Sequence, residues 1–347
     1  MTIYKLDPLT DPRWPEFLSA HPESSIFHTV GWLRALRLTY QYRPIAFTTT
    51  QKGPLSNALV LCEVQSWLTG RRLISLPFSD HCQPLAAGNE LSEMIDYLQE
   101  SRTAERWRYI ELRPAKNDSL SAAQLHYANS EHFSFQTIDL RPDLASIYQR
   151  FHPSCIRRKI KRAEREDLVY EAGTSDNLLR KFRHLLLLTR RRHKLPPQPA
   201  SWFYNIVRSL GPAATIHLLS KDSVPIASML TLTHKTTLVY KYGCSNGQFN
   251  PLGAVPLLFW KVIQQAREAG IDTFDLGRSG NEDPGLIAFK EHLGAVTSSL
   301  TYHRSPAPHI QEAALPNKVS ALARQAVSRL PDPLFAGVGQ LLYRHIA

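Results

Sequence analysis

GIDTFDLGRSGNEDPGLIAFKEHLG, residues Gly270 to Gly294, is the segment that indicates the fold. Gly270 is a typical helix stop, and the apolar run Ile271 to Leu276 after it predicts a short strand. The next residues, Gly277 to Gly280, are rich in glycine and serine and predict a turn. We therefore expect Asp275 and Arg278 at one end of a sheet.

A short helix is predicted after this turn. Asn281 or Asp283 can cap it, because a short polar side chain accepts a hydrogen bond from the first helical turn. Pro284 suits its first position, since the fixed φ of proline matches a helix. Gly294 is suited to the left-handed conformation that ends a helix.

The spacing along this helix also predicts a candidate site. Three apolar residues share one helical face: Leu286, Phe289 and Leu293. Lys290 sits at the edge of that face, where its ammonium can point into a cleft. Strand end, turn and helix together are expected to bring Asp275, Arg278 and Lys290 close to one another.

The whole chain has 347 residues, enough for a large core and two domains. Its first residues lack the apolar core of a secretory signal, and its longest apolar runs are too short to span a bilayer. We therefore expect a cytoplasmic protein.

Four cysteines are scattered along the chain without C-x-x-C spacing: Cys62, Cys82, Cys155 and Cys244. This pattern favours reduced thiols over a disulfide framework or a zinc site. Cys82 follows His81, but adjacent strand residues point to opposite faces, which argues against a nucleophile there. No bound cofactor or metal is expected.

The formal net charge is +11, and much of the excess lies between Arg150 and Lys194, where fourteen basic residues face five acidic ones. Such a cluster is suited to phosphates of a nucleotide, a tRNA, a nucleotide-sugar or an anionic lipid headgroup. For any single residue here a solvated helix face is the simpler interpretation, but the cluster as a whole indicates an anionic partner.

The first 142 residues predict one mixed α/β unit. Helices are expected near Trp14–Ala20, over a run that includes Trp32, and over Leu91–Glu100; strands are expected at Pro44–Thr50, Ala58–Val64, Tyr109–Arg113 and Phe135–Asp139. The segment Leu73–Leu85 predicts a buried strand that opens into a loop carrying Asp80, a second candidate binding position.

The second half predicts a similar order of elements over residues 143–305. Helices at Leu144–Phe151 and over the basic run near Arg157 precede a strand and a long helix from Asp176 to His193. Three strands with short turns then predict an antiparallel meander: Thr215–Ser220, Ile226–Thr233 and Thr237–Tyr242. A helix at Ala254–Ala269 leads to the opening segment, and a last strand follows at Val296–Tyr302.

Residues 306–347 predict a helical tail in two pieces, separated by Leu330-Pro331-Asp332-Pro333. Both pieces are amphipathic, so we expect them to dock on the body, with contact to a membrane surface as the alternative. The chain as a whole predicts an α+β fold with mixed, largely antiparallel sheets.

Four pieces of the sequence resemble the GNAT superfamily in its Fem-type branch, over nearly the whole chain. They are F-x-x-x-x-W at Phe27 to Trp32, the run Leu76 to Asp80, the basic run Arg157 to Ala163, and Asp275 to Ser279 combined with Phe289-Lys290-x-x-x-Gly294. That branch covers aminoacyltransferases of peptidoglycan cross-bridges and related CelD-type acyltransferases of polysaccharide synthesis.

The resemblance implies tandem GNAT-like (acyl-CoA N-acyltransferase) domains, 1–142 and 143–305, with the catalytic site in the second. It implies that Lys290 stabilises negative charge on the reacting acyl group, that Phe289 shapes the site, and that the basic helix with Arg157, Arg158 and Lys161 contacts substrate phosphates. From its place at the strand end we count Asp275 as a further catalytic candidate and Arg278 as a substrate-binding one. Asp80 and Trp32 are also substrate-binding candidates, although Trp32 is most simply a core residue. Two features depart from the family: His28 stands where Fem enzymes usually carry glutamine, and a Q/R-x-x-G-x-G/A pyrophosphate loop is not evident.

The reaction so implied is attack of an amine on an activated acyl carbon, either an ester on tRNA or a thioester on CoA. A fixed positive charge stabilises the resulting oxyanion, and Lys290 suits that role. Asp275, His292 or a substrate phosphate can take the proton of the amine. Replacing Lys290 with alanine is expected to abolish transfer and to change stability by no more than about 1 kcal/mol, as at an exposed position.

The leading hypothesis is therefore transfer of an acyl or aminoacyl group to a peptidoglycan or polysaccharide precursor of the cell envelope. The alternatives are an acyl-CoA-dependent acetyltransferase of exopolysaccharide synthesis and a non-catalytic RNA- or nucleotide-binding protein on a GNAT scaffold. Expected partners are a phosphate-bearing or lipid-linked precursor and, as a further candidate, tRNA. A DNA partner is not expected.

Overall fold

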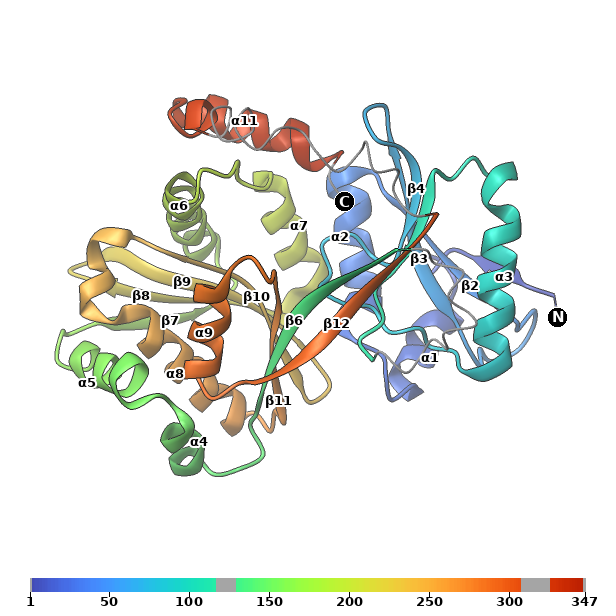
Figure 1. The fold of residues 1–347 in the computed structure, drawn as a ribbon. Coiled ribbons are helices and arrows are strands. Elements are labelled where there is room, and N and C mark those ends of the chain that lie inside the picture. Colours follow the sequence, from blue (N-terminus) through green and yellow to red (C-terminus); the bar gives the residue numbers. More distant parts are fainter. Residues whose placement is uncertain (1, 117–128, 307–324, 346–347) are drawn as a thin grey trace. The chain divides into compact units, whose positions relative to one another are not determined.

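The structure, a computed structural model, describes residues 2–116, 129–306 and 325–345 (Figure 1). Its contacts divide the chain into two compact units: Met1–Phe133 with Ser299–Asn317 and Gln340–Ala347, and Ser134–Ser298 with Lys318–Gly339. Among the described residues the chain passes from one unit to the other within β6 (Asn129–Asp139), β12 (Val296–Ser305) and α11 (Asp332–Tyr343). The domain limits expected from the sequence, at residues 142 and 305, stay a prediction.

The first unit is built on four strands that pair antiparallel in order: β1 (Tyr4–Leu6), β2 (Arg43–Thr48), β3 (Leu59–Ser66) and β4 (Gly70–Ile74). Between β1 and β2 the chain forms α1 (Arg13–Ala20), η1 (Ile26–His28) and α2 (Val30–Tyr40). After β4 come α3 (Gly88–Ala104) and β5 (Tyr109–Leu112), and β5 pairs parallel with β4. The end of β12 completes this sheet by pairing antiparallel with β5.

The second unit repeats this order. Its four antiparallel strands are β7 (Val169–Gly173), β8 (Ala214–Lys221), β9 (Val224–His234) and β10 (Thr237–Ser245). Between β7 and β8 lie α6 (Asp176–Arg192), α7 (Ala200–Leu210) and η4 (Gly211–Ala213). After β10 come η5 (Gly247–Leu252), α8 (Ala254–Glu268) and β11 (Thr273–Ser279), and β11 pairs parallel with β10 and antiparallel with β6.

The remaining helices flank this second order of elements. Ahead of β7 the chain forms α4 (Leu144–Arg150), the π-helical η3 (Pro153–Arg157) and α5 (Arg158–Ala163); α9 (Pro284–His292) follows β11, and α11 (Asp332–Tyr343) lies in the tail. No described helix combines the length and apolar character needed to cross a membrane. The apolar residues of the first tail piece, Val319 and Leu322, lie outside the described residues.

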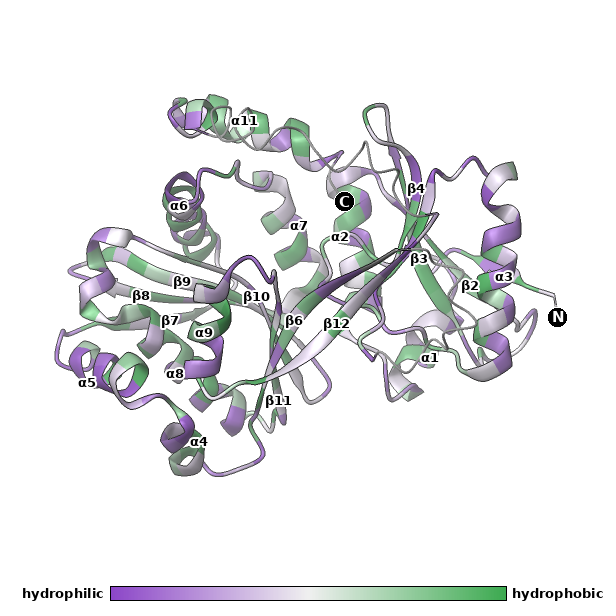
Figure 2. Ribbon diagram, in the orientation of Figure 1, coloured by the Kyte–Doolittle hydropathy of each residue, from purple (hydrophilic) through white to green (hydrophobic). Residues whose placement is uncertain are grey.

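Each unit has its own apolar core. In the first unit, α3 covers the sheet with Leu91, Met94 and Leu98, all fully buried. In the second unit, α8 is apolar on several sides and buries Leu258, Val262 and Ile263 against the sheet and α5. Figure 2 shows apolar positions along β3 and mostly hydrophilic ones on α5. The expected α+β class with largely antiparallel sheets is confirmed, since β4–β5 and β10–β11 are the parallel pairs among the described strands.

The predicted turn at Gly277 to Gly280 is wrong. Strand β11 runs on to Ser279, and its register with β6 shifts between Asp275 and Arg278. The extra residue of this bulge is accommodated at Gly277, whose φ is 71°. The helix cap was correctly predicted, because Asp283 Oδ1 accepts a hydrogen bond from Leu286 N–H.

Candidate functional site

Strands β10 and β11 of the second unit pair in parallel over a short length and then separate. Their register covers Thr237–Val239 against Thr273–Asp275, whereas β10 continues to Ser245 and β11 to Ser279. Both strands carry a bulge just beyond the paired part, between Tyr240 and Tyr242 in β10 and between Asp275 and Arg278 in β11. Two strand edges therefore diverge at the end of the sheet from which α8 and α9 begin.

A cavity of about 310 Å³ lies at the end of β10, and its lining comes from six elements: Lys159, Ile226, Ser245, Phe249, Asn250, Ala254, Val255, Pro256 and Phe289. The first turn of α8 forms one wall. Its N-cap is Gly253, which has no side chain to bind the free N–H groups of that turn. These N–H groups and the helix dipole favour a negatively charged ligand group.

Two basic residues flank this cavity. Lys159 lines it from α5, whose backbone comes so close to α8 that a Cβ at Gly253 would lie 2.5 Å from Lys159 O. Arg192, at the end of α6, donates to Ser245 O at 3.2 Å and to Ser245 Oγ at 3.3 Å. An apolar cavity with cationic groups at its rim suits a ligand that has both an apolar arm and a phosphate.

Lys290 lies inside the protein and not in a cleft. It is 3% exposed and is the buried residue of α9. Its ammonium donates to Gly277 O at 2.9 Å, to Arg278 O at 3.3 Å and to Gln136 Oε1 at 3.2 Å. Lys290 therefore ties α9 to the bulge of β11. The expectation that it occupies an exposed position is wrong, while its catalytic role stays a prediction.

Asp275 also shapes this bulge. It is 3% exposed, and its Oδ1 accepts a hydrogen bond from Gly277 N–H at 2.7 Å. The carboxylate thus holds the backbone two residues ahead, which keeps the glycine within the strand. A role of Asp275 as proton acceptor stays a prediction.

Phe289 lines the 310 Å³ cavity directly. Its ring packs edge-on against Phe259 of α8, with 5.6 Å between the centroids. Of the expected apolar face of α9, Leu293 is fully buried, whereas Leu286 is exposed. The resemblance-based expectation that Phe289 shapes the site agrees with this position but is not tested by it.

The basic run forms a second cavity, of about 540 Å³, lined by Tyr148, Pro153, Arg157, Arg158, Lys161, Arg162, Arg165 and Glu166. The structure thus brings together the predicted residues Arg157, Arg158 and Lys161. The Nε atom of Arg157 is buried and has no hydrogen-bond partner among the described residues. An anion with several oxygens would supply acceptors for such a group.

The other predicted binding residues lie elsewhere. Arg278 is exposed on β11. Trp32 is completely buried in the first unit and packs against Phe27, so its indole offers no surface to a substrate in this conformation. Asp80, also in the first unit, is half-buried, and its backbone oxygen accepts a hydrogen bond from Tyr302. We therefore leave Trp32 and Asp80 out of the site proposed below.

Two parts of the site were missed from the sequence. Gln136 is fully buried on β6, and its Oε1 accepts hydrogen bonds from Lys290 and Ser279, while its Nε2 has no partner among the described residues. A glutamine within an otherwise strand-forming run was a usable signal. The cavity wall at Phe249, Asn250 and Val255 was also missed, although Gly253 directly before an apolar helix marks a free helix start.

A protein-family model described as an acetyltransferase (GNAT) domain matches residues 151–291, which include all lining residues of the 310 Å³ cavity and all but Tyr148 of the 540 Å³ cavity. Residues 151–291 therefore match the sequence pattern of a GNAT domain. The resemblance to the GNAT superfamily that the sequence predicted is thereby confirmed, and so is the predicted fold of two GNAT-like units in tandem. A search of curated proteins finds no match.

Solved structures with the same fold include FemX, which is 16% identical, covers 94% of this chain and 100% of its own, and has a TM-score of 0.66. A tandem GNAT protein from the clavulanic acid biosynthesis pathway is 13% identical, with 89% and 99% coverage and a TM-score of 0.56. A C-terminal domain assigned to lysylphosphatidylglycerol synthetase from Agrobacterium fabrum is 12% identical, with 76% and 84% coverage and a TM-score of 0.50. At these identities the similarity concerns the fold.

Proposed function

We propose that this GNAT protein is an N-acyltransferase that moves an acyl or aminoacyl group from an activated carrier to an amine of a cell-envelope precursor. The observation that carries the proposal is the cavity at the end of β10, where the strands part and where Phe289 faces the first turn of α8. It lies within the matched GNAT domain.

The acyl donor binds in this cavity, and its carrier group, CoA or tRNA, makes the contacts. The first turn of α8, with Lys159 and Arg192 nearby, favours a phosphate, and the apolar lining favours an extended arm. The free edges of β10 and β11 offer backbone groups to an amide-containing arm, as a further strand would. Acyl-CoA carries its pyrophosphate at the other end of the pantetheine arm from the acyl group, and aminoacyl-tRNA carries a phosphate on the nucleotide that bears the acyl group.

The acceptor binds through phosphates in the 540 Å³ basic cavity. Arg158 and Lys161 line this cavity from α5, and the same helix supplies Lys159 to the donor cavity. A phosphate-bearing envelope precursor is the acceptor class that we favour, because one structural neighbour is named for an aminoacylated phospholipid, lysylphosphatidylglycerol.

In the reaction the acceptor amine attacks the acyl carbon, a C–N bond forms, and the C–S or C–O bond to the carrier breaks. The amine loses one proton, and the carrier leaves as a thiol or a hydroxyl once protonated. Lys290 acts as a positioning residue, since it fixes α9, and with it Phe289, to the β11 bulge. Direct contact of its ammonium with the oxyanion would require it to release one of its three acceptors.

An acyl-CoA-dependent acetyltransferase is the second candidate. The specific observation in its favour is the open N-terminus of α8, which is suited to the pyrophosphate of CoA although the sequence lacks the usual glycine-rich signature. The two candidates differ in the donor and share the cavity.

Melting temperatures measured with acetyl-CoA, an aminoacyl-tRNA and a UDP-linked peptide, each added alone, test the proposal. A donor that binds the folded protein raises the melting temperature, and incubation with both substrates should give an acylated acceptor detectable by mass spectrometry. A rise with acetyl-CoA alone selects the second candidate. No rise with any compound and no product would overturn both and favour a non-catalytic scaffold.

A further inference from the structure

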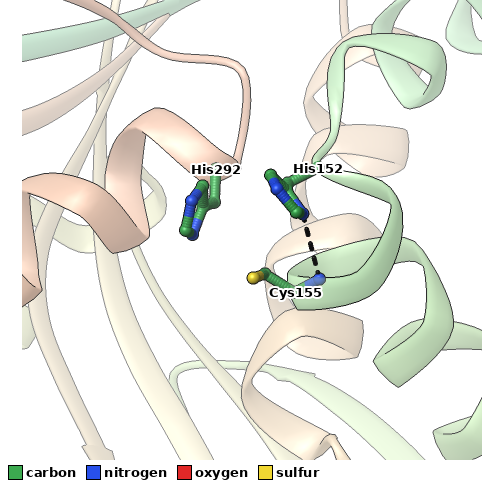
Figure 3. Close-up of side chains that lie close together, drawn as sticks. All are labelled: His152, Cys155 and His292. Carbon is green, nitrogen blue, oxygen red and sulfur yellow. Dashed lines mark hydrogen bonds between the residues drawn. The ribbon is translucent and has the colours of Figure 1, made fainter.

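Three side chains with metal-binding atoms converge beside α9: His152, Cys155 and His292 (Figure 3). His152 lies between α4 and η3, Cys155 lies in η3, and His292 is the last residue of α9. One ligand atom from each lies within 4.8 Å of the others. The group is separate from both cavities described above, whose linings contain none of the three.

The two segments that carry this cluster are held against each other by the backbone. His152 N–H donates to His292 O at 2.8 Å, and the two imidazole rings lie 4.5 Å apart between centroids. A Cβ added at Gly294 would lie 2.9 Å from Arg150 Cβ, so the chain after α9 comes close to α4. The convergence of the three side chains is therefore fixed by local structure and not by flexible side chains alone.

The donor set is suited to a transition metal. Imidazole nitrogen and thiolate sulfur are the ligands that zinc prefers, with bonds of about 2.0–2.1 Å to nitrogen and about 2.3 Å to sulfur. Those bond lengths in a tetrahedron put ligand atoms roughly 3.3–3.8 Å apart, so closure around an ion requires side-chain movements of about 1 Å. We propose that His152, Cys155 and His292 form a zinc site with a fourth position open to water.

Cys155 differs from the other cysteines in the way this proposal requires. Cys62, Cys82 and Cys244 are buried, whereas Cys155 is half-buried and within reach of an ion from solvent. A cysteine binds a metal as the thiolate and gives up its proton on binding. Zinc binding at Cys155 thus releases one proton and needs no oxidant.

The hydrogen bonds of His152 allow it to act as a ligand. Its Nδ1 accepts a hydrogen bond from Cys155 N–H at 3.2 Å and lies 3.3 Å from Ser154 Oγ. A metal on Nε2 shifts the ring proton to Nδ1, which then donates to Ser154 Oγ in place of accepting from Cys155. A ligand histidine commonly donates its second N–H in this way.

The site would clamp the end of α9 onto the segment that leads into the basic helix α5. Lys290 and Phe289 lie two and three residues before His292, so a metal here would hold the helix that carries them. His292 then serves as a ligand and not as the proton acceptor of the reaction. Sequence spacing favours no zinc site, because the third ligand follows the H-x-x-C pair only after more than a hundred residues.

Cobalt titration of the full-length protein tests this site. The protein is stripped of metal with a chelator, kept reduced, and titrated with Co²⁺, whose bonds to thiolate give charge-transfer absorption in the near ultraviolet. We expect one equivalent to bind with this band, Zn²⁺ to displace it, and Zn²⁺ to raise the melting temperature. No thiolate band, or no rise with Zn²⁺, would overturn the proposal.

Matched variants identify the ligands. Cys155→Ser should abolish the charge-transfer band, and His292→Asn should weaken Zn²⁺ binding at least about tenfold. His152→Asn should also weaken Zn²⁺ binding at least about tenfold. Its side-chain oxygen can still accept the hydrogen bond from Cys155 N–H that caps η3, so this variant separates the loss of the metal from the loss of the cap. His184→Asn, at an exposed position on α6, should bind as the unmodified protein does. Unchanged binding in Cys155→Ser would assign the metal to another place and refute the site.

Discussion

The two units have the same order of elements, but they differ at the end of the sheet beyond their parallel strand pairs, β4–β5 and β10–β11. In the first unit the loop between β4 and α3 folds back into the sheet, where Ser75 N–H donates to Glu111 O and Cys82 N–H donates to Arg113 O. The Arg113 guanidinium donates to Leu76 O and Ser79 O of the same loop. The first unit thus fills the end of its own sheet.

In the second unit the corresponding connection, η5, turns away and leaves the 310 Å³ cavity beside the first turn of α8. The described cavity of the first unit, of about 290 Å³, lies instead between α1 and Pro54–Ser56. In this protein the connecting loop therefore decides whether a cavity lies at the end of the sheet. The donor site that we propose lies in the second unit, and the predictions below test this proposal.

The largest effect is expected from filling the second cavity. Val255→Trp places an indole at the first turn of α8, in the volume that we assign to the donor. We expect kcat/KM to fall at least about 100-fold, or about 2.7 kcal/mol in the barrier. Steady-state kinetics measure it, with the donor that raises the melting temperature in the binding experiment.

The matched control is Asn89→Trp, at an exposed position in the first turn of α3 in the first unit. It should leave kcat/KM unchanged. Equal losses in both variants would break the distinction between the units, as would full activity in Val255→Trp.

Lys290→Met should be the next largest change. It keeps the length of the side chain but removes the ammonium donor from Gly277 O and Arg278 O, and leaves Gln136 Oε1 with Ser279 Oγ as its donor. Since buried acceptors without a donor are costly, we expect the free energy of unfolding to fall by about 2–4 kcal/mol and kcat to drop. Denaturant unfolding and kinetics on the folded fraction measure the two effects.

Arg113→Met is the counterpart in the first unit, because Arg113 likewise binds backbone carbonyls and also pairs with Glu111. It should destabilise the protein comparably without lowering kcat per folded molecule. A kcat loss as large as that of Lys290→Met would show that the first unit takes part in the reaction.

The order of strands and helices was predictable because it depends on local periodicity, which the sequence displays directly. The course of β11 was not predictable from the sequence. Gly277 is typical of a turn, and its place within the strand depends on the hydrogen bond from Gly277 N–H to Asp275 Oδ1. The burial of Lys290 was equally hidden, because its acceptors include Gln136, which is 154 positions away. The sequence could not show which of the candidate residues reach solvent.

A further effect, seen only on acidification, concerns the second unit. Burial lowers the pKa of His217 to about 4, while the unfolded chain titrates near 6.5. Between these values the unfolded state binds the extra proton, so stability falls as pH drops from about 6.5 to 4, by up to about 3 kcal/mol.

His217→Gln removes this titration and should flatten the pH dependence of unfolding in that range. Hydrogen exchange should locate the change in β8 and β9 and not in β3. A pH dependence identical to that of the unmodified protein would mean that other groups cause the acid sensitivity.

The smallest effects are expected at the rim of the basic cavity. Arg158 and Lys161 are exposed, so each contributes only a screened interaction with an acceptor phosphate. Replacing either with alanine should raise the KM of the acceptor about three- to fivefold, with kcat and melting temperature unchanged. The effect should shrink as salt is added. Arg34→Ala, an exposed change on α2 of the first unit, should leave KM as it is. If Arg34→Ala raises KM as much, net positive charge and not this cavity attracts the acceptor, and the two units no longer differ in acceptor binding.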